Sequence, residues 1–521
     1  MKYQFEFLEN EYWWGGSTVD GCENPFHAKS VFEWDYRETA YNQSMMLFLS
    51  SKGRYMWSEE PFKVQIANGK FTFEGGEIEL IEAGNCLRDA YMTAMQTHFP
   101  FDGKVLPREF FKTAQYNTWM EFTYHPTQEG VLNYAHAILE HGLKPGILII
   151  DEGWQQNYGV WEFDEKKFPN PKAMVQELHE LGFVVMLWVV PWVACSGQHF
   201  VLDSGMEEVP NRDNVERFIR NAAGDIGIFE WWNGYSAMLD LDDQEDFAFL
   251  DGQLQKLIDD YGIDGFKFDG GSITEYHASK MINGPVRDGW NPARLNRAWN
   301  DFGLRYPYHE YKDTYKGGGK NCIQRLCDKN HAWEPDGINM LIPCSVLQGL
   351  LGYPFICPDM IGGGLWNINI TPGFEIDQEL FVRMAQVSAL CPMMQFSWAP
   401  WKALDELHFD MVREAALLHE SMSDELISLV AESEQDGEPI LRNLEYNYPG
   451  CGYEKIVDQF MLGEDILVAP VVTPHTYQRE VVFPKGQWKD ANGRFYDGGQ
   501  TLCLESPLDT LLWFRKIKSV Q

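Results

Sequence analysis

The segment Gly262-Ile-Asp-Gly-Phe-Lys-Phe-Asp-Gly-Gly271 ends a short, mostly apolar run on a carboxylate, Asp269, with two glycines directly behind it. The run predicts a short buried strand, since apolar runs bounded by glycine are typical of strands inside a parallel sheet. The glycines would let another molecule approach the backbone closely. We therefore expect Asp269 at the mouth of a pocket, where a carboxylate can act as a nucleophile. The alternative is a β-turn after an ordinary strand.

Segments with the composition of strands alternate with helical patterns along the middle of the chain. The predicted strands are 115–122, 146–151, 183–191, 265–269, 321–327, 331–336, 355–359 and 393–397. Between two of them, Met174, Leu178 and Leu181 recur at helical spacing, and Gly182 suits the C-terminal cap. Eight strands alternating with helices favour an α/β fold of the (β/α)8 TIM-barrel type. An open, doubly wound sheet is the competing architecture.

The N-terminal and C-terminal parts of the chain have residue patterns typical of short strands and lack long stretches with helical periodicity. Residues 1–112 alternate short β-like runs with turn signals, and Asn68-Gly69 between two such runs is a hairpin signal. The same texture returns after about residue 435. We expect an N-terminal antiparallel β-sandwich over 1–112, a catalytic barrel over 113–435 and a C-terminal antiparallel β-sandwich over 436–521, in one or two parts.

The charge balance is strongly acidic, with 77 acidic and 42 basic residues and a formal net charge of −35. A field of this sign repels phosphates, so neither nucleic acid nor an anionic membrane is an expected partner. The longest apolar run, 183–194, is too short to span a bilayer, and the first residues lack a secretion signal pattern. Ten cysteines without metal-ligand spacing are expected as buried free thiols. These features favour a cytoplasmic protein.

Four of the predicted strands end on a carboxylate: Asp151, Asp269, Asp336 and Asp359. In a barrel the chemistry lies at the carboxyl ends of the strands, so these acids are expected at one rim. Each could instead cap a helix or a turn. Converging carboxylates raise one another's pKa, so that one can stay protonated while another is ionised. A carboxylate pair is the pattern of glycoside hydrolysis, and an aromatic content of 14% suits the binding of sugar rings.

Other reaction chemistries lack their motifs. The chain has no H-E-x-x-H, no clustered histidine or cysteine ligands and no G-x-S-x-G elbow. We therefore expect neither a metal nor a cofactor.

From about Gln115 to Phe514 the chain resembles glycoside hydrolase family 31, the retaining α-glycosidases. The segments that carry the resemblance are Gln115-Tyr-Asn-Thr-Trp-Met-Glu121, Trp161-Glu-Phe-Asp-Glu-Lys-Lys-Phe-Pro-Asn-Pro-Lys-Ala-Met174, Gly182-Phe-Val-Val-Met-Leu-Trp-Val-Val-Pro191 and Gln459-Phe-Met-Leu-Gly-Glu-Asp-Ile-Leu-Val-Ala-Pro-Val471. Together they are much more specific than any one motif.

The resemblance implies a role for individual acids. Asp269 falls where the family keeps its nucleophile, although the usual Asp-x-x-Glu continuation is Asp-Gly-Gly-Ser here. Trp333-Glu-Pro-Asp-Gly337 falls where the family has Trp-x-Gly-Asp-Asn, which makes Asp336 the expected acid/base. Asp359, in the Asp-Met-Ile-Gly-Gly segment, is its rival. The residues expected to contact substrate are Asp151, Glu152, Trp188, Lys267, Arg325, Trp333, Asp359 and Trp398.

Two of these contacts can also be interpreted from the residues alone. Lys267 lies two residues before Asp269 on one strand and so faces the same side of the pleat. Its charge would keep Asp269 ionised or bind a sugar hydroxyl, and a structural salt bridge is the alternative. Glu152 would point away from Asp151 by strand alternation unless the turn at Gly153 swings it back, and the alternative is a solvated loop acid.

The reaction implied is exo-acting, retaining α-glycoside hydrolysis of a small carbohydrate through a covalent glycosyl-enzyme. The segment 350–363 is similar to the myogenesis-regulating glycosidase branch, which acts on α-galactosides, so the expectation leans to an α-galactosidase. An α-glucosidase, α-xylosidase or α-N-acetylgalactosaminidase of the same family is an alternative. A transglycosylase and a non-catalytic carbohydrate-binding protein on the same scaffold are also consistent with these residues.

Overall fold

The computed structural model describes residues 2–196, 217–365 and 371–518. Its centre is one parallel sheet in the order β20-β19-β17-β16-β12-β11-β10-β22-β21. The strands are β10 (Gln115–Asn117), β11 (Ile147–Ile150), β12 (Val184–Val189), β16 (Gly265–Phe268), β17 (Tyr308–Tyr311), β19 (Gln324–Arg325), β20 (Ile356–Cys357), β21 (Met360–Ile361) and β22 (Gln395–Phe396).

The sheet closes into a barrel through its seventh strand. Its two ends, β20 and β21, are separated in the chain by only Pro358 and Asp359. The first half pairs with β19 and the second half with β22, so one stretch of chain joins both ends of the sheet. The predicted TIM barrel is thus confirmed, and the open sheet is excluded.

One predicted strand is wrong and one observed strand was not predicted. Segment 331–336 forms bends in the loop between β19 and α8, where proline and exposed polar residues interrupt any ladder. The fifth barrel strand is instead β17, whose sequence Tyr-His-Glu-Tyr lacks an apolar run. Its Glu310 accepts a hydrogen bond from Gln395 across the barrel, so a polar side chain occupies an interior position there.

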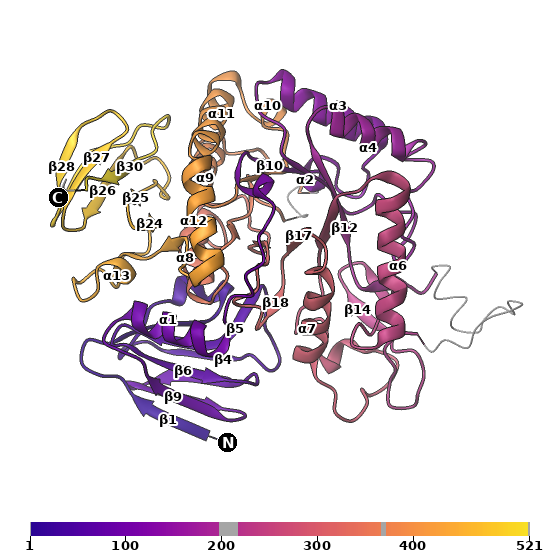
Figure 1. The fold of residues 1–521 in the computed structure, drawn as a ribbon, viewed down its shortest axis with the longest axis horizontal. Coiled ribbons are helices and arrows are strands. Elements are labelled where there is room, and N and C mark those ends of the chain that lie inside the picture. Colours follow the sequence, from indigo (N-terminus) through magenta and orange to yellow (C-terminus); the bar gives the residue numbers. More distant parts are fainter. Residues whose placement is uncertain (1, 197–216, 366–370, 519–521) are drawn as a thin grey trace, which may run out of the picture.

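The longer helices surround the barrel strands (Figure 1). They are α3 (Gln128–Glu140), α4 (Pro171–Glu180), α6 (Gln244–Tyr261), α7 (Pro292–Gly303), α8 (Ile338–Leu350), α9 (Gln378–Ala389), α11 (Glu406–Ser421) and α12 (Ser423–Asp436), with short helices α2 (Trp119–Phe122) and α10 (Pro400–Ala403). In α4, Met174 and Leu178 are buried, and Asn170 caps the first turn by accepting from the Ala173 amide. Gly182 follows with φ +94°, as expected for a C-terminal cap.

The N-terminal part forms two antiparallel sheets, β1-β8-β7-β4 and β3-β2-β5-β6-β9, followed by α1 (Leu87–His98). The strands are β1 (Lys2–Glu6), β2 (Tyr12–Ser17), β3 (Phe26–His27), β4 (Phe32–Asp35), β5 (Gln43–Ser50), β6 (Arg54–Ser58), β7 (Lys63–Ala67), β8 (Lys70–Glu74) and β9 (Ile78–Glu82). Asn68 and Gly69 both have positive φ between β7 and β8, so the predicted hairpin is confirmed. Strand β18 (Thr314–Tyr315) of the barrel region pairs with β5 and ties this part to the barrel.

The C-terminal part is also antiparallel, with a six-stranded sheet β23-β24-β25-β30-β27-β28 and the pair β26-β29. Its elements are β23 (Leu441–Arg442), α13 (Leu444–Asn447), β24 (Phe460–Leu462), β25 (Ile466–Val468), β26 (Gln478–Phe483), β27 (Gln487–Asp490), β28 (Phe495–Asp497), β29 (Gln500–Glu505) and β30 (Trp513–Lys516). Phe483, Trp488 and Phe514 are buried in its core. Helix α8 contacts elements of both flanking parts, so both sit against the same side of the barrel (Figure 1).

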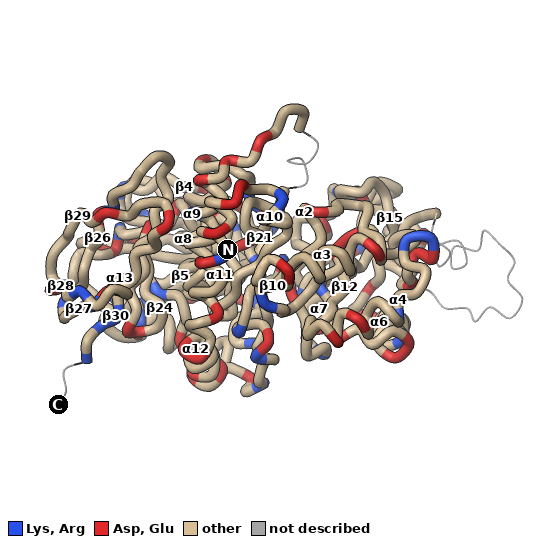
Figure 2. Tube along the Cα trace, turned by 90° about the horizontal axis from the view of Figure 1, so that it is seen from above, with Lys and Arg blue, Asp and Glu red and all other residues tan. Residues whose placement is uncertain are grey.

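A small sheet, β13-β15-β14, is inserted after β12. It consists of β13 (Trp192–Ala194), β14 (Phe229–Trp231) and β15 (Gly234–Met238). In the view of Figure 2, segments with acidic residues and segments with basic residues are interspersed along the described chain. Within the described ranges, no helix is long and apolar enough to cross a bilayer.

Candidate active site

Asp269 lies directly after β16 at the carboxyl end of the barrel, with 5% of its surface exposed. Its Oδ2 accepts a hydrogen bond from Trp188 Nε1 at 2.9 Å, and its Oδ1 lies 3.0 Å from Lys312 Nζ. Lys267 Nζ is 3.9 Å from Oδ2. Burial alone would raise the pKa of Asp269, but the charges of Lys312 and Lys267 outweigh it and hold the pKa below its ordinary value. The carboxylate is therefore ionised, as a nucleophile must be.

Lys267 and Asp151 form a buried ion pair beside Asp269. Lys267 Nζ lies 2.6 Å from Asp151 Oδ2, and the Asn117 side-chain amide donates to the same oxygen at 2.7 Å. The three residues come from β16, β11 and β10 or the residues that directly follow them. Lys267 thus forms a structural salt bridge with Asp151, and its charge also helps to keep Asp269 ionised. Both interpretations of this lysine therefore apply.

Glu152 is buried, although strand alternation predicts that it points away from Asp151. Gly153 follows it with φ +94°, which re-aims the chain at this turn. The Glu152 Oε1 atom accepts hydrogen bonds from Tyr158 Oη at 2.7 Å and from the Asn233 side-chain amide. Burial, with the nearby charges of Asp151 and Asp269, raises the pKa of Glu152 to about 8. The side chain is a neutral carboxylic acid at neutral pH rather than a solvated loop acid.

A second carboxylate, that of Asp328, contacts the same lysine as Asp269. Lys312 follows β17, and its Nζ lies 3.6 Å from Asp328 Oδ2 as well as 3.0 Å from Asp269 Oδ1. Arg325 in β19 donates to Asp328 Oδ1 at 2.8 Å. Burial alone would raise the pKa of Asp328, but the charges of Lys312 and Arg325 outweigh it and lower the pKa. Asp269 and Asp328 are therefore two carboxylates held around one ammonium group.

Asp336, the predicted acid/base, lies in a different place. Its side chain is 42% exposed, and its ion pair is with Lys329 Nζ at 3.7 Å. The Asn330 amide donates to the Asp336 carbonyl and closes 330–336 into a loop between β19 and α8. Trp333 lies in the same loop and donates through its indole to Asp377 at the start of α9. The structure thus leaves both residues away from the contacts around Asp269.

Asp359, the predicted rival, is buried at the junction of β20 and β21. Its Oδ1 accepts from Arg325 at 2.8 Å and its Oδ2 from the Lys329 amide at 2.7 Å. Burial raises its pKa to about 7, against the opposing charge of Arg325. Both oxygens are engaged as acceptors, so Asp359 orients the guanidinium that contacts Asp328.

The other two predicted tryptophans, Trp188 and Trp398, lie on β12 and just after β22, which β11 and β10 separate in the sheet. Trp188 pairs in register with Lys267 across β12 and β16 and donates to Asp269. Trp398 follows β22 and packs with Trp119 and Met360. Its indole N–H is buried without an acceptor among the described residues.

Sequence reasoning missed Lys312, Asp328, Asn117, Tyr158 and Asn233. Asp328 had a usable signal, because it directly follows the predicted strand 321–327 just as Asp269 follows its own strand. Lys312 had none, since the strand that precedes it was not predicted. Asn117 was inside a quoted motif, but an amide carries no charge signal. Tyr158 and Asn233 lie on loops whose path only the fold defines.

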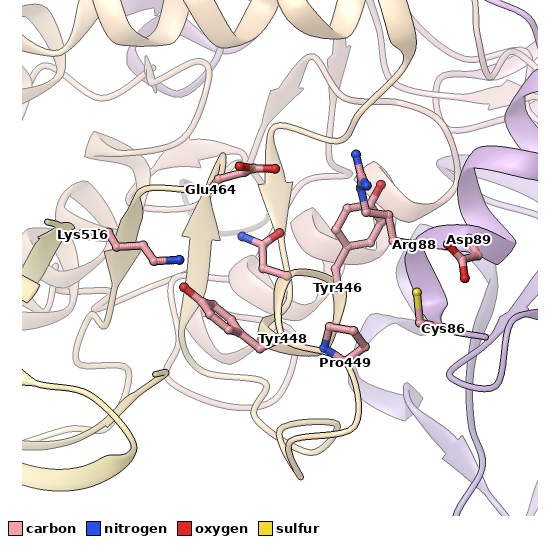
Figure 3. A pocket seen from close by; sticks show the side chains of 9 residues that line it. Cys86, Arg88, Asp89, Tyr446, Tyr448, Pro449, Glu464 and Lys516 are labelled. Carbon is pink, nitrogen blue, oxygen red and sulfur yellow. The ribbon is translucent and has the colours of Figure 1, made fainter. Parts of the chain in front are cut away.

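A separate pocket lies where α1 meets α13 and β30 (Figure 3). It is lined by Cys86, Arg88, Asp89, Tyr446, Asn447, Tyr448, Pro449, Glu464 and Lys516. Arg88 forms an ion pair with Glu438, and Lys516 lies 4.9 Å from the centre of the Tyr448 ring. Its charges are of both signs and partly paired. Among the described residues, no group of His, Cys, Asp and Glu side chains is arranged to hold a metal ion.

Comparison with known proteins assigns the family. Residues 107–416 match the model of the glycosyl hydrolases family 31 TIM-barrel domain, and residues 437–519 match the glycosyl hydrolase family 31 C-terminal domain. The chain is 32% identical to mouse myogenesis-regulating glycosidase over 82% of its own length and 59% of that protein. It is 26% identical to alpha-glucosidase 2 of Bacillus thermoamyloliquefaciens over 87% of its length and 58% of that enzyme.

The chain thus spans somewhat under two thirds of the length of these relatives. A Flavobacterium johnsoniae family 31 dextranase, solved with glucose, has the same fold with a TM-score of 0.84 at 19% identity, over 99% of this chain and 66% of that one. On the match of its barrel and C-terminal domains, the chain belongs to glycosyl hydrolase family 31.

Proposed function

We propose that the protein is a retaining, exo-acting α-glycosidase in which Asp269 is the nucleophile and Asp328 the acid/base. The observation that carries the proposal is the pair of carboxylates around Lys312. Two oxygens that lie 3.0 and 3.6 Å from one nitrogen are at most about 6.6 Å apart, which is compatible with the roughly 5–5.5 Å of retaining enzymes and too short for most of the inverting range. This assignment replaces Asp336 by Asp328.

The proposed reaction has two displacements. In the first, Asp328 takes up a proton when the bound sugar covers its exposed side, because the added burial raises its pKa. Asp328 then gives this proton to the leaving oxygen while an Asp269 oxygen attacks the anomeric carbon and the bond to the leaving oxygen breaks. In the second, Asp328 takes a proton from water, and the hydroxide oxygen displaces Asp269 from the anomeric carbon. The two lysines beside Asp269 keep it ionised for the first step and stabilise it as the leaving group in the second.

The sugar at the reaction centre is proposed to be α-galactose. Asp151 and Lys267 offer an acceptor and a donor beside the nucleophile, and neutral Glu152 offers a donor next to them. A site that hydrogen-bonds a hydroxyl in one orientation strongly rejects an epimer that lacks it there. Relatives named α-glucosidase and α-xylosidase have the same fold family, so the choice of sugar depends on these contacts.

A screen of nitrophenyl α-glycosides tests the activity and the sugar together. We expect kcat/KM for the α-galactoside to exceed that for the α-glucoside, α-xyloside and α-N-acetylgalactosaminide by at least about tenfold, or roughly 1.4 kcal/mol of transition-state binding. Preference for another sugar would overturn the galactose proposal alone. Absence of turnover would instead favour a carbohydrate-binding protein, and transfer to an added sugar would favour a transglycosylase.

The nucleophile has its own test. Asp269→Ala is expected to lower turnover by several orders of magnitude, and added azide is expected to restore it with a β-glycosyl azide as product. Asp336→Ala, an aspartate outside the cluster, serves as the control. Activity of Asp269→Ala close to that of the wild type would contradict the double displacement.

A further inference from the structure

The hairpin formed by β14 and β15 reaches the mouth of the barrel. Trp231 pairs with Gly234, so Trp232 and Asn233 form the tip. Asn233 donates from its side-chain amide to Glu152 Oε1 and, at 2.9 Å, to Tyr158 Oη. One residue of the tip thus touches the acid proposed to bind the sugar.

Trp232, the other residue of the tip, packs against two rings and stays partly exposed. It packs edge-on against Trp192 and Trp231, with ring centroids 5.3 and 4.9 Å apart. Both of those rings are buried, whereas Trp232 is 44% exposed. An exposed indole fixed by two buried ones presents a flat apolar surface that no described residue covers.

This surface adjoins the nucleophile. A side chain on Gly270, the residue after Asp269, would come within 3.2 Å of the outer edge of the Trp232 ring. Lys312 Nζ, which contacts both Asp269 and Asp328, lies 5.9 Å from the centre of the ring. The indole therefore lies near the ammonium group that contacts both carboxylates.

Exposure increases from the nucleophile toward the indole. The side chain of Asp269 is 7% exposed, that of Lys312 18% and that of Asp328 22%. The sugar attacked by Asp269 would occupy the closed side of this path, beside Asp151 and Lys267. The leaving group must then extend past Asp328, which protonates its oxygen, toward the open side that Trp232 borders.

We propose that Trp232 is the binding platform for the leaving group and that this group is a neutral pyranose ring. The inference rests on the proposed glycosidase activity and names the substrate class as an oligosaccharide rather than a glycoside with a small aglycone. A pyranose presents a C–H face that packs on indole and a rim of hydroxyls. Lys312 and Asp328, beside the indole, supply a donor and an acceptor for those hydroxyls.

Two substrates with the same sugar separate binding of the leaving group from the chemistry. An α-glycosyl fluoride has no leaving sugar to stack, whereas the matching α-linked disaccharide has one. Trp232→Ala is expected to lower kcat/KM for the disaccharide by about ten- to a hundredfold, in the range of a lost aromatic contact, and that for the fluoride by no more than about twofold. Trp232→Phe, which keeps an aromatic face, is expected to recover most of the disaccharide activity.

Tyr235→Ala provides the matched control, since Tyr235 is an exposed aromatic residue of the same hairpin at 57% exposure. It is expected to leave both substrates unaffected. Equal losses of Trp232→Ala on both substrates would show that the tip only supports Glu152 and would overturn the platform. Unchanged disaccharide activity would overturn it as well. A wild-type protein that turns over neither substrate would instead overturn the glycosidase activity on which the inference rests.

Discussion

At the scale of single residues, the site is a balance of buried charges. Asp269, Asp328 and Asp151 are offset by Lys267, Lys312 and Arg325. Opposite charges 4 Å apart interact by about 4 kcal/mol at an effective dielectric constant near 20, and an attraction of this size opposes the effect of burial on Asp269 and Asp328. This explains why the pKa values of Asp269 and Asp328 fall while that of Glu152, which forms no ion pair with another described residue, rises.

The roles of Asp328 and Asp336 can be separated by leaving-group chemistry. Asp328→Ala is expected to lose at least about a hundredfold in kcat/KM on an α-linked disaccharide and much less on a dinitrophenyl glycoside, because an activated phenolate needs little protonation. For Asp336→Ala, kcat/KM is expected to stay within about threefold of the wild-type value on both substrates, since the Asp336 side chain pairs with Lys329. The reverse pattern in steady-state kinetics would return the acid/base role to Asp336.

Glu152 is expected to set an alkaline limit to activity. With a pKa of about 8, it is protonated at neutral pH and loses its donor above that value, while adding a negative charge near Asp269. On an activated nitrophenyl glycoside, kcat/KM should therefore fall as pH rises through about 8. Glu152→Gln cannot ionise, so this fall should disappear while activity at pH 6–7 stays within about threefold of wild type.

Stability gives a second readout for Glu152. Between about pH 4.5, where the unfolded chain ionises, and pH 8, the folded state holds the extra proton, so its free energy of unfolding falls as pH rises. Glu152→Gln should weaken this dependence in denaturant unfolding. An alkaline limb and a stability profile identical to wild type would mean that Glu152 is not the titrating group.

At the scale of elements, the turn after β16 explains the two glycines that follow Asp269. We expected them to admit another molecule, but the protein's own rings fill the space. A side chain on Gly270 would come within 2.1 Å of the Trp192 ring, and one on Gly271 within 2.6 Å of Trp299. Both glycines also have positive φ, at +63° and +73°. The indoles thus fix the backbone that carries Asp269, the proposed nucleophile.

Gly270→Ala should therefore displace Asp269 or Trp192. We expect kcat to fall by at least about a hundredfold, because a displacement near 1 Å from the reactive geometry has such a cost. Gly252→Ala in α6 is the control, since beyond its own turn of helix no atom of the described residues lies within 4 Å of the added carbon. It should keep activity and gain roughly 0.5–1 kcal/mol in stability. Wild-type turnover by Gly270→Ala would show that the turn tolerates a shift.

At the scale of the whole molecule, the N-terminal part completes the barrel rim. β17 and β19 pair through Tyr311 and Gln324, and Asn42 bridges the residues beyond them. Its side-chain amide donates to the carbonyls of Lys312 and Arg325, and its Oδ1 accepts from the Cys327 amide. The same asparagine thus holds the backbone of Lys312 and of the residue before Asp328.

Asn42→Gly removes this bridge while permitting the backbone φ of +60°. We expect kcat to fall at least about tenfold on glycosyl fluorides and disaccharides alike, because Lys312 and Asp328 lose their support. Asn68→Gly makes the same change at a residue with φ +52° in the β7–β8 turn and should leave kcat unchanged. Equal activity of the two variants would show that the barrel positions its rim without the N-terminal part.

The sequence by itself determined the barrel, its flanking antiparallel sheets and the place of Asp269. These follow from local patterns, because buried parallel strands are apolar runs and barrel chemistry lies where such runs end. The same rule could have predicted Asp328 as a site residue, since it directly follows the predicted strand 321–327. Asp336 was predicted as the acid/base because its motif resembles a family motif, although the chain around it forms the 330–336 loop rather than a strand end.

Only the tertiary structure decided which groups meet at the rim. β17 carries a polar interior residue, so its strand and Lys312 behind it have no apolar signal. Glu152 is turned inward by a glycine and paired by Asn233, about 80 residues further along the chain. Trp232 lies on the inserted β14–β15 hairpin, and Asn42, which contacts the rim, belongs to the N-terminal part. Contacts of this kind depend on strand register and on the packing of distant segments, which no local pattern of residues records.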